Sequence, residues 1–140
     1  MKLLLAADGS AYTQKALDFI IAHKHILGAE HELVVVHAQM PLPAGFNVIM
    51  GFDKAQELHM IEAETVFKPV KKLLDEHAIK YRCLTGAGPI VQEIIDTAKT
   101  EHVHLIVMGT HGRDLVGRAL MGSVAQRMVA NSTVSVLLVK

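Results

Sequence analysis

Short apolar runs alternate with longer segments of helical periodicity along the whole chain. Three of these runs are almost continuously apolar, which is typical of parallel strands that are covered on both faces. Such runs predict five strands, at residues 2–7, 32–38, 79–85, 104–109 and 133–139.

The segments between the runs repeat their apolar residues about every 3.6 positions, as amphipathic helices do. They predict helices over 11–27, with Gly28 as the stop, over 53–77 and over 89–100, and a last helix that starts at Ser123. Pro69 lies inside the second pattern and predicts a kink or a break there. The buried side of that helix is expected to carry Leu58, Ile61, Val66, Val70, Leu73 and Leu74.

This order of elements predicts the fold class. Strands and helices that alternate at these lengths form βαβ units with right-handed crossovers and an open parallel sheet. The 140 residues are enough for one core, and no repeat or linker divides them, so residues 1–140 are predicted to form a single α/β domain. The long connection 39–51 is too apolar for a plain solvated loop. We expect it to pack over a site or against another subunit, with a disordered tip as the alternative.

Composition narrows the possible functions. Fourteen basic and fourteen acidic side chains balance and are scattered, so no footprint for DNA, RNA or an anionic membrane is visible. The lone Cys83 excludes an internal disulfide and fits a reducing compartment, where it would serve as a small core side chain. The apolar start before Asp8 is too short for a signal sequence or a membrane span, and a cytoplasmic protein is expected.

Glycines are concentrated between the fourth predicted strand and the last predicted helix. Gly109, Gly112, Gly117 and Gly122 fall within fourteen positions, and Ser123 follows directly. A strand, a glycine-rich loop and a helix N-terminus together form a cradle of main-chain amides that favours an anion. Any Cβ at the approach points would hold a phosphate away from those amides. The stretch therefore predicts a phosphate site.

Two residues of this region also have purely structural interpretations. The sequence "SVAQ" at 123–126 matches a capping box, in which the Ser123 side chain bonds a first-turn amide and Gln126 reaches back. Asp8, followed by Gly9 and Ser10, could simply turn the chain into the first helix with Ser10 as its N-cap. Both alternatives stay open beside contact with a ligand.

Two familiar phosphate loops are excluded. No lysine occurs between Lys99 and Lys140, so there is no Walker sequence, and "AADGSAYTQ" after the first strand lacks G-x-G-x-x-G. The observed spacing is G-x2-G-x9-G-[S/T], and it resembles that of the universal stress protein family in its ATP-binding branch. The resemblance covers essentially the whole chain. It includes "AADGS", "VVHA", "GAGPIVQEII", "LIVMGTHGR" and "VSVLLVK" in order.

The resemblance implies a fold and a site. The family's sheet has five parallel strands in the order 3-2-1-4-5, with helices on both faces, as in adenine nucleotide alpha hydrolase-like and flavodoxin-like proteins. Strands 1 and 4 then meet at the switch point, where open α/β sheets bind ligands. By this resemblance Asp8 and the backbone near Ala7 and Ala38 line the adenine and ribose side, and Met108 and Gly109 form the floor. Ribose and phosphates would be held by Gly112, Gly122, Ser123 and Val124.

Charged side chains in and near the loop could neutralise phosphate. His111, Arg113 and Arg118 lie inside it, and Arg118 is the preferred candidate because it is nearer the predicted helix start. Asp8 would repel a triphosphate unless it contacts ribose, base or Mg²⁺. The histidine pairs at 23–25 and 102–104 lack the spacing of metal ligands, and no protein-held metal site is predicted.

The resemblance implies a nucleotide-binding stress protein, with ATP as the ligand, or ADP or AMP, with or without Mg²⁺. Residues 133–139 would be an apolar strand at the edge of the sheet. Pairing with the same strand of a second copy would protect its unpaired main-chain groups, so a homodimer is expected. Slow ATP hydrolysis or self-phosphorylation is an alternative, as is an interaction protein that binds no nucleotide. A single nearby carboxylate and no clear base beyond His111 favour binding over turnover. "CLTGAG" offers no acceptor aspartate, which argues against a phospho-acceptor module, and a flavoprotein of the same layering would be coloured.

Overall fold

The computed structural model describes residues 1–27, 32–113 and 121–140, and its architecture is the predicted one. Five parallel strands form one sheet in the order β3-β2-β1-β4-β5, as expected. The strands are β1 (Lys2–Ala6), β2 (Glu32–Gln39), β3 (Tyr81–Ala87), β4 (Leu105–Gly109) and β5 (Ser135–Val139). The helices are α1 (Ala11–Ala22), a 3₁₀ turn (Lys24–Leu27), α2 (Phe46–Met50), α3 (Phe52–Glu76), α4 (Ile90–Thr100) and α5 (Ser123–Asn131).

Each face of the sheet has its own apolar core. On one face, α1 and α3 pack on alternate strand residues, with Leu5, Leu17 and Leu74 fully buried. On the other face, α4 and α5 cover the intervening strand residues, with Leu4 and Met128 at the centre. Because successive side chains of a strand point to opposite faces, each continuous apolar run contributes side chains to both cores.

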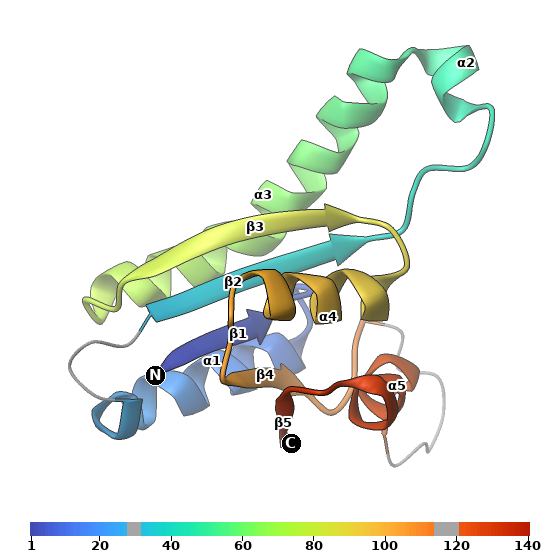
Figure 1. Cartoon of the computed structure of the whole chain (residues 1–140). Helices are drawn as coiled ribbons and strands as arrows, with labels where there is room; N and C mark the ends of the chain where they lie inside the picture. The colour runs from blue at the N-terminus through green and yellow to red at the C-terminus, as the bar shows by residue number, and fades with distance from the viewer. Residues whose placement is uncertain (28–31, 114–120) are drawn as a thin grey trace.

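The connection 39–51 and the start of α3 extend beyond the carboxyl ends of the strands (Figure 1). Leu58 and Ile61 were expected on the buried side of this helix, and that prediction is wrong: they are 44% and 56% exposed. The part of α3 that packs on the sheet core buries its larger apolar residues, among them Val66, Val70 and Leu74.

The structure refines the predictions at three further places. The first helix ends at Ala22 and continues as the 3₁₀ turn, while Gly28 lies outside the described residues. Pro69 does not break α3, which continues through it. Residues 46–50 form the short helix α2, which no periodicity predicted. In the described parts of the chain, no helix combines the length and apolarity that crossing a membrane requires.

Candidate functional site

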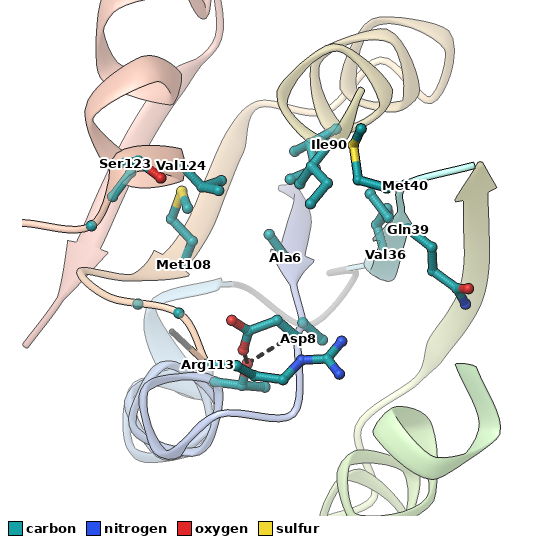
Figure 2. Close-up of a pocket in the computed structure, with 18 of the residues that line it drawn as sticks. Ala6, Asp8, Val36, Gln39, Met40, Ile90, Met108, Arg113, Ser123 and Val124 are labelled. Carbon is teal, nitrogen blue, oxygen red and sulfur yellow. Dashed lines mark hydrogen bonds between the residues drawn. The ribbon is translucent and has the colours of Figure 1, made fainter. Parts of the chain in front are cut away.

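A cavity of about 460 Å³ opens at the carboxyl ends of β1, β2 and β4, between the two helix layers. This volume is within the range of small-molecule sites. Figure 2 shows Ser123 and Val124 on one side, Gln39 and Met40 on the opposite side, and Asp8 beside Arg113. The position is the switch point of the 3-2-1-4-5 sheet, where the connections from β1 and β4 leave on opposite faces.

Nine of the ten residues predicted for the site line this one cavity. Asp8 and Gly112, about a hundred positions apart, come so close that a Cβ on Gly112 would lie 2.9 Å from the Asp8 carboxylate. The tenth residue, Arg118, lies outside the described residues. The nine are Ala7, Asp8, Ala38, Met108, Gly109, Gly112, Gly122, Ser123 and Val124.

The start of α5 lies at this cavity with first-turn amides that no hydrogen bond of the described residues is seen to use. Gly122 is the N-cap and offers no side-chain hydrogen bond, and the first helical bond runs from the Gln126 amide to the Gly122 carbonyl (3.0 Å). Ser123, Val124 and Ala125 all line the cavity. As first-turn residues, they have main-chain amides without a partner within the helix. Together with the helix dipole they favour an anion here.

The predicted capping box does not form. Ser123 is the first residue of α5 rather than its cap, and its side chain is exposed. The Gln126 side chain donates instead to the Met121 carbonyl (2.9 Å). The Gly122 amide donates to the Thr110 carbonyl just after β4 (2.8 Å), and this tertiary bond holds Gly122 in the cap position.

The glycines of the cradle have packing reasons as well as the expected one. A Cβ on Gly109 would overlap Tyr12 of α1, so this glycine permits close packing of helix on strand. A Cβ on Gly122 would lie 3.2 Å from the His111 Cα and 3.3 Å from the Thr110 carbonyl oxygen. Among the cradle positions, Gly112 has its close neighbour inside the cavity, namely Asp8.

Asp8 does form the turn into α1. Its Oδ1 accepts from the Ser10 amide (2.9 Å) and the Thr13 hydroxyl (2.7 Å), while Ser10 caps the helix by accepting from the Thr13 amide (3.2 Å). Burial acts to raise the pKa of Asp8, but these hydrogen bonds and the nearby Arg113 charge together lower it. The carboxylate is thus held ionised, and its other oxygen is directed toward Gly112.

The end of β2 exposes main-chain groups to the same cavity. The Ala7 amide donates to the Val36 carbonyl (2.8 Å), which is the last bond between β1 and β2, and the Gly88 amide donates to Gln39 on the other side (2.9 Å). Since successive residues of a strand direct their polar groups to opposite sides, the amide and carbonyl of Ala38 point to the β1 side, where β1 has ended.

Sequence reasoning missed several lining residues, and three polar ones belong to α3 or its anchor, namely Gln39, His59 and Glu62. The buried Gln39 side chain donates to the His59 carbonyl (2.9 Å) and accepts from the His59 ring, which fixes α3 beside the cavity. Glu62, one turn further along, forms an ion pair with Arg113 (2.9 Å). The interrupted apolar pattern of 53–62 was the available signal, because a solvated helix over a site needs no apolar stripe.

No protein-held metal centre is visible in the described residues, where no three His, Cys, Asp or Glu side chains gather for it. His37 is buried, and its Nδ1 donates to the Ala7 carbonyl (2.8 Å). His111 packs on Tyr12 with 4.9 Å between ring centroids and pairs with the Thr110 hydroxyl. Both rings support the loops around the cavity.

Comparison with known proteins gives matches over the full length. The sequence model of the Universal stress protein family matches residues 1–140 of the chain. Universal stress protein MJ0531 of Methanocaldococcus jannaschii is 31% identical over 139 residues, which covers 99% of this chain and 81% of that protein. A universal stress protein of Thermus aquaticus, from the QAH/OAS sulfhydrylase 3' region, is 33% identical over 138 residues. The match covers 99% of this chain and 97% of that protein.

Solved structures are similar in fold. The hypothetical protein MJ0577 superposes with a TM-score of 0.83 at 26% identity, over 99% of this chain and 94% of that one. A universal stress protein in complex with cAMP superposes with a TM-score of 0.68 at 18% identity, over 99% of this chain and 95% of that one. A universal stress protein family protein from Arabidopsis thaliana with AMP bound also gives a TM-score of 0.68, at 12% identity, over 100% of this chain and 91% of that one.

Proposed function

The chain belongs to the universal stress protein family, and from this premise we propose that it binds an adenine nucleotide, ATP above all, in the cavity at the ends of β1 and β4. Relatives of the same fold are described with AMP and with cAMP. The observation that carries the proposal is the pair of opposed main-chain surfaces, with Ala38 on one wall and the open amides of α5 on the other.

The two surfaces would bind different parts of the nucleotide. The Ala38 amide and carbonyl offer one donor and one acceptor, which match the edge of adenine, while apolar Ile90 and Met108 cover its faces. Asp8 is directed toward the ribose, and Gly112, Gly122, Ser123 and Val124 receive the phosphates. A Mg²⁺ ion that arrives with ATP would be held by phosphates and the Asp8 carboxylate, as such sites use few protein ligands.

We infer that binding rather than turnover is the function. Asp8 Oδ1 is engaged by two donors, and the His111 ring packs against Tyr12. Efficient phosphoryl transfer needs a group that orients the nucleophile and a metal clamp. The protein would then signal by its loaded state. Repeated turnover of labelled ATP, lost on substitution of a cavity residue, would overturn this view.

A homodimer through β5 completes the proposal. Val136, Leu137, Leu138 and Val139 form the end of the sheet, and β5 pairs only with β4 among the described strands. An apolar edge strand is protected from aggregation when the same strand of a second copy pairs with it.

The test is calorimetry and thermal unfolding with AMP, ADP and ATP, with and without Mg²⁺, and with GTP as the matched control for the base. A ligand at about a hundred times its dissociation constant stabilises the fold by roughly 2.7 kcal/mol. We expect that gain for adenine nucleotides and a smaller one for GTP. Unfolding that none of these ligands shifts, with no nucleotide detected by mass spectrometry in the purified protein, would refute the proposal.

A further inference from the structure

An ion pair joins the two walls of the cavity near its opening. Arg113 Nη2, in the loop that follows β4, lies 2.9 Å from Glu62 Oε1 on α3. Both side chains are about half exposed, at 49% and 46%. The two residues are 51 positions apart and belong to different elements, and both line the cavity.

Arg113 occupies a special position among the lining residues. It is the only lysine or arginine among the described residues that line the cavity. It directly follows Gly112, and its charge contributes to the lowered pKa of Asp8. The guanidinium therefore lies within the field of two carboxylates, those of Glu62 and Asp8.

Glu62 has a second neighbour that it reaches without moving far. Its Oε1 lies 3.7 Å from Nε2 of His37. That nitrogen is buried and has no hydrogen-bond partner among the described residues. The other ring nitrogen of His37 is engaged by the Ala7 carbonyl, so the ring is fixed with Nε2 toward Glu62.

An exposed carboxylate holds an arginine weakly, because water screens the pair and two long side chains must be ordered. A phosphate group offers more charge and accepts the guanidinium in bidentate geometry. A phosphate chain that enters the cavity would thus compete with Glu62 for Arg113.

We propose that Arg113 exchanges its partner on nucleotide binding: Glu62 holds it when no nucleotide is bound, and the phosphates take it over. The inference rests on the proposed function and adds a specificity device to it. Arg113 makes affinity increase with the number of phosphates, and Glu62 acts as an internal competitor that weakens this gain.

The experiment measures dissociation constants of adenosine, AMP and ATP by calorimetry, without Mg²⁺ and at fixed ionic strength. For Arg113→Gln we expect ATP to bind about tenfold more weakly, AMP less affected and adenosine unchanged. For Glu62→Gln we expect ATP to bind three- to tenfold more tightly. Glu64→Gln is the matched control, since Glu64 is on the same helix but pairs with Lys71 outside the cavity, and its constants should equal those of the unsubstituted protein.

The double variant separates exchange from simple repulsion. If Glu62 acts by holding Arg113, most of the gain from Glu62→Gln disappears when Arg113 is already glutamine. A gain that persists in full means that Glu62 only repels phosphate, and a loss in Glu62→Gln means that it positions Arg113; either result overturns the exchange. Equal weakening of adenosine and ATP by Arg113→Gln also overturns it while leaving nucleotide binding intact. Absence of binding by all three ligands refutes the proposed function itself, and the exchange with it.

Discussion

Helices α1 and α5 both begin at the carboxyl end of a strand, and they begin in opposite ways. At α1, Ser10 caps the helix, and Asp8 accepts two further hydrogen bonds from the same turn. At α5, the cap is Gly122, which has no side chain, and the Ser123 hydroxyl is exposed. The first start uses its hydrogen-bonding groups locally, whereas the second leaves amides open to a cavity.

The difference shows where the molecule can bind something. At α1 a side chain already satisfies one first-turn amide, that of Thr13, whereas no side chain in the described structure caps α5. A start capped by glycine gives up roughly a few tenths of a kcal/mol relative to a serine cap and keeps an anion site. Serine follows glycine in both turns, at 9–10 and 122–123, so composition alone does not distinguish them.

The largest effect is expected from a carboxylate placed at the open start. Ser123→Asp should weaken binding of ATP at least tenfold, because the new charge occupies the phosphate site and repels the ligand. It should leave the free energy of unfolding unchanged or raise it by about 0.3–1 kcal/mol, since a negative charge suits a helix N-terminus. Calorimetry and urea unfolding measure the two quantities.

Ala11→Asp is the matched control, because Ala11 is the exposed first residue of α1 and does not line the cavity. ATP affinity should change by less than about twofold there, because Ala11 lies outside the lining of the cavity in which the ligand is proposed to bind. Equal weakening by both variants would mean that the two helix starts do not differ in ligand binding.

A smaller effect is expected when each serine is shortened. Ser10→Ala should lower the free energy of unfolding by about 1 kcal/mol, because it removes the cap of α1. Ser123→Ala should change it by only a few tenths, since that hydroxyl caps nothing in the described structure. Chemical denaturation of the two variants in parallel tests this, and equal losses would contradict the contrast.

The smallest effect concerns the pH dependence contributed by Asp8. Its hydrogen bonds hold the pKa below the ordinary value of 3.8, so the folded state binds a proton less readily than the unfolded state. The resulting stability is present above the unfolded pKa and is lost as the pH falls through the lowered folded pKa. The stability difference between the unsubstituted protein and Asp8→Asn should therefore shrink below about pH 4. A difference that stays constant from pH 7 to 3 would contradict the assignment.

Periodicity predicted the strands of the sheet and most of its helices, because local burial leaves a regular pattern in the chain. It failed for Leu58 and Ile61, since the apolar pattern of α3 does not say where the sheet beneath it ends. It failed for the capping box because the Gly122–Thr110 bond decides which residue is the cap. The Glu62–Arg113 pair left no trace, because the two residues belong to elements that meet only in the fold.

By itself the sequence determined the layered α/β architecture, and its glycine spacing predicted an anion site that remains a prediction. Short-range chemistry suffices for these: alternating burial selects strands and helices, and glycine permits close approach to the main chain. The tertiary structure alone decided which helix start stays uncapped, that Asp8 faces Gly112, and that α3 supplies a wall with Glu62 opposite Arg113. Those relations depend on how distant elements are placed on the sheet, and no local pattern encodes that placement.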